Sequence, residues 1–384
     1  MGVVETDKKY VANTYARADV VFIRGKGATL TDRWGNKYID FGSGIAVNGL
    51  GVGYKKWKRA VKAQINALPH ASNLYYTQPC AELAKLLCKR TGMKKVFFSN
   101  SGAEANECAI KTARKYSFDK YGENRFKIVT LENSFHGRTL TTLSATGQDA
   151  FHQYFMPFTD GFVHVPADDF EAMETAVTDE VCAVMIELVQ GEGGVRALDK
   201  EYVKKIETLC KKKDVLLIVD EVQTGNGRTG SLYAFMQYGI SPDIVTTAKG
   251  LGNGLPIGAT MFAAKCEKTL TAGTHGSTFG GNPVACAGAI AVVKALNEKV
   301  LSGVETKSRR IRDVLAACPK AKSVSGLGLM IGVETENAAK LKEECLNKGL
   351  VVLTAKDKLR LLPPLNIGDD ELERGLEILR EVLG

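Results

Sequence analysis

The sequence lacks several patterns that identify common classes of protein. No run of about twenty apolar residues could span a membrane, and the N-terminal region, with Glu5 and Asp7, has no apolar stretch typical of a signal peptide. We therefore expect a cytoplasmic protein without a membrane partner. The nine cysteines show no CxxC or zinc-ligand spacing, since the closest two, Cys80 and Cys88, lie eight residues apart. We expect buried thiols in a reducing compartment and no metal site.

Signatures of nucleotide and nucleic-acid binding are also missing. The chain contains no GxxxxGK[ST] loop, and no strand is followed by GxGxxG and a ribose-binding acid. The net charge of +8 could attract nucleic acid, but the Lys and Arg residues are interleaved with acids, as in residues 199–213. We therefore expect no nucleic-acid partner, and the charge fits an attraction of small anionic substrates.

The chain itself has the length and composition of a two-domain globular protein. Its 384 residues exceed what one hydrophobic core usually supports, and 45% hydrophobic residues argue against disorder. Between residues 94 and 264, apolar runs alternate with amphipathic stretches, which is typical of an α/β sheet of mostly parallel strands. We expect seven strands in one large sheet, at residues 95–99, 126–131, 161–165, 181–188, 215–220, 243–247 and 257–263.

The remaining segments predict a smaller α+β domain. Residues 27–41 read as a hairpin outside the main sheet, with Gly35 and Asn36 in its turn. We expect an N-terminal segment (1–50) that packs with the small domain, a large cofactor-binding domain (51–282) and a C-terminal small domain (283–384). In the last of these, helical patterns at 283–297, 302–316, 336–348 and 369–382 surround short strands at 328–334 and 350–353.

Small residues follow the first strand of the predicted sheet. Ser101, Gly102 and Ala103 come just after the strand 95–99 and before a helical pattern with Glu104 in its first turn. Ligands bind beyond the carboxyl ends of strands in open α/β sheets, and the unpaired N–H groups at a helix start attract anions. The pattern predicts a phosphate-binding site, although a simple helix cap would have the same sequence.

Two charged residues end neighbouring strands of the same sheet. Asp220 ends the apolar run 215–220, and alone it could be a metal ligand, a general base or a counter-ion. Lys249 lies among small residues just past the strand 243–247, where partial desolvation favours the neutral, nucleophilic amine; a surface lysine is the alternative. An anion site, a carboxylate and an amine on one sheet edge are the three groups that pyridoxal 5'-phosphate requires.

Long motifs over nearly the whole chain resemble the class III (fold type I) aminotransferases, most closely the branch of N-acetylornithine and ornithine aminotransferases. The motifs are NTYARAD from residue 13, GKGATLTDRWGNKYIDFGSGIAVN from 25, SNSGAEANECAIKTARK from 99, SFHGRT from 134, ELVQGEGGV from 187, VDEVQTGNGRTG from 219, AKGLGNGLPIGA from 248, GSTFGGNP from 276 and LRLLPPL from 359. Motifs of this length in this order are highly specific. The resemblance implies a fold type I transferase dependent on pyridoxal phosphate, and a homodimer with shared active sites.

The resemblance also implies which residues bind the cofactor. Phe135 would stack on its ring and Gln223 would donate to its phenolic oxygen, although a core Phe and an ordinary turn residue would look the same. Thr278 would reach the cofactor phosphate or the substrate of the other subunit. Lys249 and Asp220 would be catalytic. The full implied cofactor set is Ser101, Gly102, Ala103, Phe135, Asp220, Glu221, Val222, Gln223, Lys249 and Thr278.

A second implied set binds the substrate. Arg138 would hold the distal carboxylate and Arg360 the α-carboxylate of glutamate, since a guanidinium binds a carboxylate bidentately; surface ion pairing is the alternative for both. We hypothesise that Glu192 pairs with Arg360 when the diamino acid is bound and swings away for glutamate. Ser277 and Tyr15 complete the implied set, and Tyr15 does not decide between the candidate substrates.

The implied reaction is a ping-pong transamination of N2-acetyl-L-ornithine with 2-oxoglutarate, giving N-acetyl-L-glutamate 5-semialdehyde and L-glutamate, as in arginine biosynthesis. Ornithine or another ω-amino acid, such as succinylornithine or 4-aminobutyrate, is the alternative substrate. The sequence departs from the family at two places. Residues 52–57 read VGYKKW where relatives usually have a His-rich turn, and Asn226 stands where relatives often carry an apolar residue.

Overall fold

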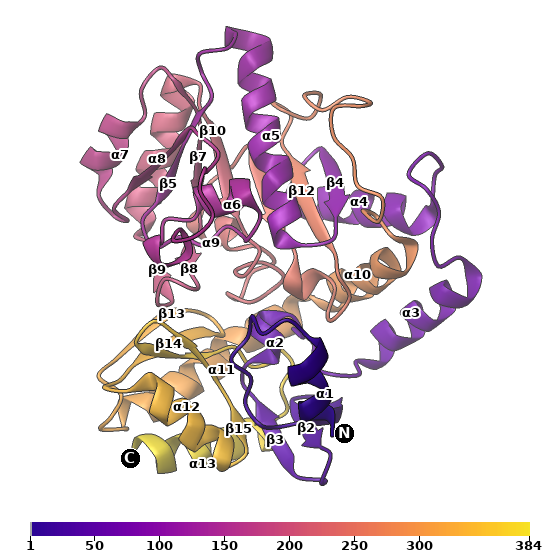
Figure 1. Cartoon of the computed structure of the whole chain (residues 1–384), viewed down its shortest axis with the longest axis vertical. Coiled ribbons are helices and arrows are strands. Elements are labelled where there is room, and N and C mark those ends of the chain that lie inside the picture. Colours follow the sequence, from indigo (N-terminus) through magenta and orange to yellow (C-terminus); the bar gives the residue numbers. More distant parts are fainter. Residues whose placement is uncertain (1) are drawn as a thin grey trace.

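The computed structural model describes residues 2–384, and Figure 1 shows them as two bodies. The upper body holds the large sheet and its helices. The lower body brings strands from the N-terminal part of the chain together with C-terminal helices and strands. The predicted N-terminal segment 1–50 is described from residue 2 on, and the exact domain boundaries at residues 50 and 282 remain a prediction.

The large sheet has seven strands in the order β4-β12-β11-β10-β7-β5-β6. All seven predicted strands are therefore confirmed within a residue or two, together with the α/β class. Only β12 runs antiparallel to its neighbours β11 and β4; the other pairs are parallel. The strands are β4 (Lys95–Ser99), β5 (Lys127–Leu131), β6 (Phe162–Val165), β7 (Val181–Ile186), β10 (Leu216–Asp220), β11 (Ile244–Thr247) and β12 (Gly258–Phe262).

Helices bury both faces of this sheet, which explains the continuous apolar runs of its strands. Successive side chains of a strand point to opposite faces. Leu216 and Ile218 of β10 pack in one apolar cluster with residues of helix α5 (Gly102–Tyr121). Leu217 and Val219 pack in the other cluster, which contains Val203 and Ile206 of helix α8 (Lys200–Lys213).

The predicted hairpin lies in a separate four-stranded sheet of order β1-β2-β3-β15. Strands β2 (Thr29–Asp32) and β3 (Lys37–Asp40) are antiparallel, and the carboxylate of Asp32 accepts hydrogen bonds from Trp34 N and Asn36 N across the turn. Strand β15 (Leu350–Val351) pairs with β3, so residues more than 300 positions apart share one sheet. This pairing anchors the N-terminal segment on the C-terminal part of the chain.

A second small sheet has the order β13-β14-β17-β16 and is antiparallel throughout. The sequence predicted β14 (Met330–Glu334) but missed β13 (Ser323–Leu327) and β17 (Lys358–Leu361), which are short and contain Gly or Lys. Strand β17 matters for function because it carries Arg360. The helices near these sheets are α11 (Glu298–Ala316), α12 (Ala338–Asn347) and α13 (Asp369–Leu383), with strand β16 at Leu353–Ala355.

Helices α3 (Lys55–Ala67), α4 (Gln78–Thr91) and α10 (Pro283–Ala295) pack together beside the large sheet.

Over residues 2–384, none of the helices combines the length and the apolar character needed to cross a bilayer. The other elements are α1 (Val3–Tyr10), β1 (Phe22–Lys26), α2 (Ser43–Ala46), α6 (Leu140–Ala145), η1 (Asp149–Phe151), α7 (Phe170–Ala176), β8 (Val189–Gln190), β9 (Arg196–Ala197), α9 (Ala234–Tyr238) and η2 (Lys249–Leu251).

Candidate active site

A cavity of about 440 Å³ opens beside the carboxyl ends of β10 and β11 and the start of α5. This volume suits a small ligand or cofactor. The cavity brings together nine of the predicted site residues: Ser101, Gly102, Ala103, Phe135, Arg138, Asp220, Val222, Gln223 and Lys249. Its other lining residues are Val47, Asn100, Asn106, His136, Gly137, Glu187, Ala248, Gly254, Leu255, Pro256 and Ile257.

The start of α5 forms one wall of the cavity. Ser101 caps the helix, since its Oγ accepts a hydrogen bond from Glu104 N at 3.2 Å. Among residues 2–384, no partner accepts a hydrogen bond from the backbone N–H of Gly102 or Ala103. A Cβ atom on Gly102 would lie 2.6 Å from Val222 Cγ1, so only glycine fits there. The predicted cap is therefore present, and the helix start also has unpaired N–H groups of the kind that can bind an anion.

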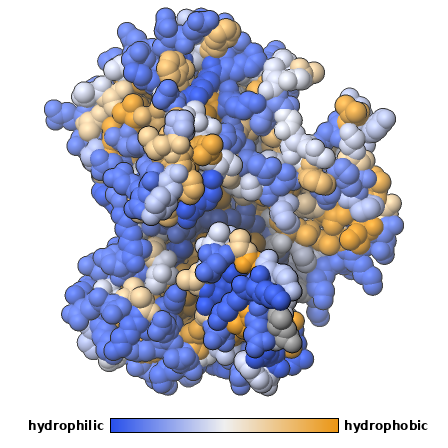
Figure 2. Space-filling model, in the orientation of Figure 1, coloured by the Kyte–Doolittle hydropathy of each residue, from blue (hydrophilic) through white to orange (hydrophobic). Residues whose placement is uncertain are grey.

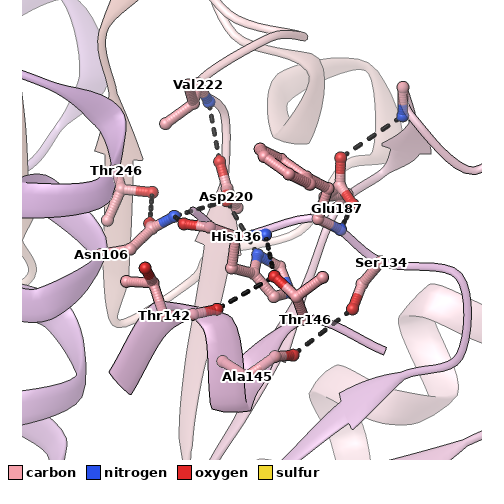
Figure 3. Close-up of polar contacts among 12 residues, drawn as sticks. Asn106, Ser134, His136, Thr142, Ala145, Thr146, Glu187, Asp220, Val222 and Thr246 are labelled. Atoms are coloured by element: carbon pink, nitrogen blue, oxygen red, sulfur yellow. Dashed lines mark hydrogen bonds and ion pairs between the residues drawn. The ribbon is translucent and has the colours of Figure 1, made fainter. Parts of the chain in front are cut away.

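Asp220 is buried and accepts three hydrogen bonds (Figure 3). Its Oδ2 lies 2.7 Å from Asn106 Nδ2 and 2.8 Å from His136 Nδ1, and its Oδ1 accepts from Val222 N at 2.9 Å. Asn106 is itself held by Thr246, whose hydroxyl donates to Asn106 Oδ1 at 2.7 Å. These bonds fix the carboxylate in one orientation at the cavity wall.

Lys249 begins the 3₁₀ turn η2 directly after β11, with φ at +42°, a region that L-residues rarely adopt. Burial lowers the pKa of Lys249 below the ordinary value for lysine; the negative charge of Glu192 opposes this shift, and the positive charge of Arg360 adds to it. A lowered pKa increases the fraction of neutral amine. The neutral amine is the form that can act as a nucleophile or take up a proton.

Glu187 lies at the end of β7 on the same side of the sheet and was not predicted as a site residue. Its Oε1 accepts a hydrogen bond from Phe135 N at 2.8 Å. Burial raises the pKa of Glu187 to about 7, and the carboxylate of Asp220 adds to the rise while His136 opposes it. Glu187 thus fixes the backbone of Phe135 at the cavity wall.

Arg360 and Glu192 form an ion pair beside the cavity. Arg360 Nη1 donates to Glu192 Oε1 at 2.6 Å and to Gln223 Oε1 at 3.2 Å. The side chain of Arg360 is 4% exposed and that of Glu192 is 25% exposed. Glu192 is therefore the more accessible partner of the pair.

Several predicted residues do not reach this cavity. Glu221 is buried beneath it, where its carboxylate accepts from Thr224 Oγ1 at 2.5 Å and from Phe235 N at 2.7 Å. Tyr15 is 69% exposed and lies in the N-terminal segment. Thr278 is exposed. Ser277 contacts Asn100 at the cavity edge, its Oγ lying 3.2 Å from Asn100 Nδ2.

Among the cavity residues that were not predicted, three hydrogen-bond to Asp220 or Phe135: Asn106, His136 and Glu187. A signal existed for two of them. Glu187 ends an apolar run in the same way as Asp220, and His136 adjoins Phe135 within the SFHGRT motif. Asn106 gives no such signal, because its contact with Asp220 depends on how α5 crosses the sheet.

Comparisons with known proteins agree with this geometry. The family described as aminotransferase class-III matches residues 10–383. The acetylornithine aminotransferase of Haemophilus ducreyi is 54% identical and is matched over 99% of this chain and 98% of its own. The succinylornithine transaminase of Yersinia pseudotuberculosis is 44% identical and is matched over 96% of this chain and 93% of its own. A solved ornithine aminotransferase from Toxoplasma gondii, with partial occupancy of PLP at its active site, aligns with a TM-score of 0.95 at 33% identity, covering 99% of this chain and 93% of that structure.

Proposed function

Because the chain belongs to the class-III aminotransferase family, we propose that it transfers the terminal amino group of N2-acetyl-L-ornithine to 2-oxoglutarate. The products are N-acetyl-L-glutamate 5-semialdehyde and L-glutamate, and the reaction belongs to arginine biosynthesis. The relatives named acetylornithine aminotransferase support this choice, since several match nearly the full chain at 43–54% identity.

The cofactor of this aminotransferase is pyridoxal 5'-phosphate, and the cavity fits it. The open N–H groups of Gly102 and Ala103 suit the phosphate. The buried carboxylate of Asp220 suits the pyridine nitrogen, the half-buried ring of Phe135 suits the ring face, and the amine of Lys249 suits the aldehyde.

When bound, the cofactor supplies an aldehyde that condenses with amines and a ring that withdraws electrons from the reacting carbon. Asp220 would keep the ring nitrogen protonated, and its bonds to Asn106 and His136 prevent it from turning away. Lys249 Nζ, with its lowered pKa, would take a proton from the substrate carbon and return it. Both groups lie on strand ends of one rigid sheet, which holds them in place.

Two arginines would orient the substrates. Arg138 would bind the carboxylate farthest from the reacting amine, and Arg360 would bind the α-carboxylate of glutamate. Acetylornithine reacts through its terminal amine and presents no carboxylate to Arg360, so Glu192 would then occupy the guanidinium. Gln223, which also contacts Arg360, would in addition bind the phenolic oxygen of the cofactor.

We also infer a cytoplasmic homodimer with shared active sites. Figure 2 shows apolar side chains gathered over the region of α3 and α4, and the exposed apolar residues of this region and of the 270–280 loop include Ile65, Leu68, Leu74, Tyr75, Tyr76 and Phe279. Such a face fits a second copy of the chain. Thr278 adjoins Phe279 and is exposed, so it would enter the cavity of the other subunit, and Ser277 and Tyr15 would contribute to the substrate site of the dimer.

One observation carries the proposed reaction: Lys249, Asp220 and the open start of α5 line a single cavity. The test is an amine screen with the purified, cofactor-loaded enzyme. N-acetylornithine should bleach the visible absorbance faster than ornithine or 4-aminobutyrate do. A faster response to ornithine would instead select an ornithine aminotransferase. Succinylornithine is the second candidate substrate, because its transaminase is about as similar to this chain as several acetylornithine enzymes.

A further inference from the structure

Arg138 lies at the cavity and has no polar partner among the residues that the structure describes. It is exposed, and within residues 2–384 its guanidinium makes no hydrogen bond or ion pair. An unpaired arginine normally samples many rotamers, and binding a carboxylate would have to overcome that freedom. Two aromatic rings take the place of polar partners. The guanidinium carbon lies 5.5 Å from the ring centre of Phe135 and 4.1 Å from that of Phe151.

Phe151 is the closer ring, and it comes from a different segment of the chain. It ends the 3₁₀ turn η1 and is half-buried. Its ring also meets that of Phe135 edge to face, with centroids 5.7 Å apart and an angle of 76° between the planes. Phe151 thus touches both the proposed carboxylate-binding residue and the ring that would cover the cofactor.

The turn that carries Phe151 is fixed to the cavity wall. Gln148 Nε2 donates to the carbonyl of Ser134 at 2.9 Å, and Phe151 N donates to the carbonyl of Gln148 at 3.0 Å. Asn133 N donates to the carbonyl of Gly147 at 2.6 Å. These bonds tie the segment before Phe151 to Asn133 and Ser134, which directly precede Phe135 in the chain. The Phe151 ring therefore keeps a set position relative to Phe135 and Arg138.

We propose that Phe151 is a positioning residue for specificity: it holds the Arg138 guanidinium against its ring face so that the N–H groups point towards the distal carboxylate of the substrate. A cation over an aromatic face is attracted by the ring quadrupole while its N–H edge stays free. The inference rests on the proposed function, because it takes Arg138 as the binding residue for that carboxylate.

The test compares two keto acids in the full-length, cofactor-loaded enzyme. 2-Oxoglutarate carries a distal carboxylate, whereas 2-oxopentanoate lacks one. Phe151→Leu should raise KM for 2-oxoglutarate about threefold to tenfold, as loss of a cation–π contact predicts, with little change in kcat. KM for 2-oxopentanoate should stay unchanged. Phe151→Tyr keeps the ring and should restore the normal KM for 2-oxoglutarate.

Two further variants act as controls. Phe155→Leu makes the same change four residues later, at a half-exposed ring that does not contact Arg138, and should leave both KM values unchanged. Calorimetry with glutarate adds a readout independent of turnover, and Phe151→Leu should weaken its binding by the same factor. Thermal unfolding of each variant shows whether the segment remains folded.

Arg138→Ala separates this inference from the proposed function. If Arg138→Ala weakens glutarate and 2-oxoglutarate but Phe151→Leu does not, the positioning role is wrong and the role of Arg138 stands. If Arg138→Ala changes KM by the same factor for both keto acids, the carboxylate-binding role of Arg138 is wrong, and the inference is wrong with it. An equal rise in KM for both keto acids in Phe151→Leu would also overturn the inference, since it would mean a general disturbance of the cavity.

Discussion

The guanidinium of Arg360 and the carboxylate of Glu192 lie 2.6 Å apart at the edge of the cavity that holds Lys249. The arginine is almost fully buried on strand β17, and the glutamate comes from a Gly-rich loop after β8. Breaking a buried ion pair by removing one partner leaves the other charge unpaired. The pair is therefore suited to an exchange in which a substrate carboxylate replaces Glu192.

Glu192→Ala should favour the glutamate half-reaction over the acetylornithine half-reaction. Without Glu192, the guanidinium of Arg360 would be free to bind the α-carboxylate of glutamate, but its charge would be unpaired when acetylornithine is bound. We expect the ratio of the two single-turnover rate constants to change about tenfold or more, which corresponds to roughly 1.4 kcal/mol. Stopped-flow absorbance measures each half-reaction separately. Equal effects on both half-reactions would contradict the exchange.

The pH dependence of Lys249 should respond to its two charged neighbours in opposite directions. Neutral Lys249 reacts with pyridoxal phosphate, so the rate of reconstitution of the apoenzyme should rise as pH increases through the pKa of Lys249. Glu192 raises this pKa and Arg360 lowers it. Glu192→Gln should therefore move the rise to lower pH, and Arg360→Met should move it to higher pH. A shift of both variants in the same direction would be incompatible with these electrostatic roles.

Asp220→Asn should lower kcat about 10²- to 10³-fold, as expected for the loss of a group that stabilises transition-state charge. Asn keeps the size of the side chain but removes the negative charge that would hold the ring nitrogen protonated. Steady-state kinetics measures the loss. Asp119→Asn, at an exposed aspartate paired with Lys115 on α5, is the matched control and should keep normal activity. Nearly full activity of Asp220→Asn would show that another residue fills this role.

The two positions expected from the sequence to differ from relatives, Asn226 and residues 52–57, both contact the loop that carries Lys249. Asn226 Nδ2 donates to Thr247 Oγ1 at 2.8 Å and to the carbonyl of Ala248 at 3.2 Å, on one side of Lys249. Trp57, the last residue of VGYKKW and part of helix α3, donates to the carbonyl of Gly252 at 2.9 Å on the other side. Asn226 also adopts φ of +56°, which Asn tolerates better than an apolar residue.

Asn226→Leu should therefore lower the free energy of unfolding by about 1–3 kcal/mol, through the lost hydrogen bonds and the strain at positive φ. Denaturant unfolding measures this change. Asn226→Gly isolates the hydrogen bonds, because glycine adopts positive φ without strain. If Asn226→Leu had the same free energy of unfolding as the wild-type protein, the loop would be stabilised without Asn226.

The large sheet could be predicted because its strands are buried on both faces and read as unbroken apolar runs such as VLLIVD. Asp220 and Lys249 could be predicted for the same reason, since Asp220 ends such a run and Lys249 lies just past one. Strand β17 could not be predicted from the sequence, because its four residues KLRL include two charges. Only its pairing with β14 and β16 makes it a strand. Arg360 was therefore found by resemblance and not by pattern.

The contacts within the site were harder to predict than its members. Glu221 directly follows Asp220 in the sequence, yet it faces Thr224 and Phe235 instead of the cavity, because adjacent residues at a strand end point to opposite sides. The link between Arg138 and Phe151 depends on a turn anchored at Ser134, and spacing along the chain does not reveal that anchor. The placement of Tyr15 and Thr278 near a cavity depends on a second subunit and stays a prediction.

The central claim is that Lys249 holds the cofactor, and borohydride reduction of the purified enzyme tests it most directly. Borohydride converts the linkage between lysine and aldehyde into a stable bond, so the visible absorbance should disappear and peptide mass mapping should find the pyridoxyl group on Lys249. Lys249→Ala should carry no such group after the same treatment. A reduced enzyme with the group on another lysine, or a protein that stays colourless with added pyridoxal phosphate, would contradict the account.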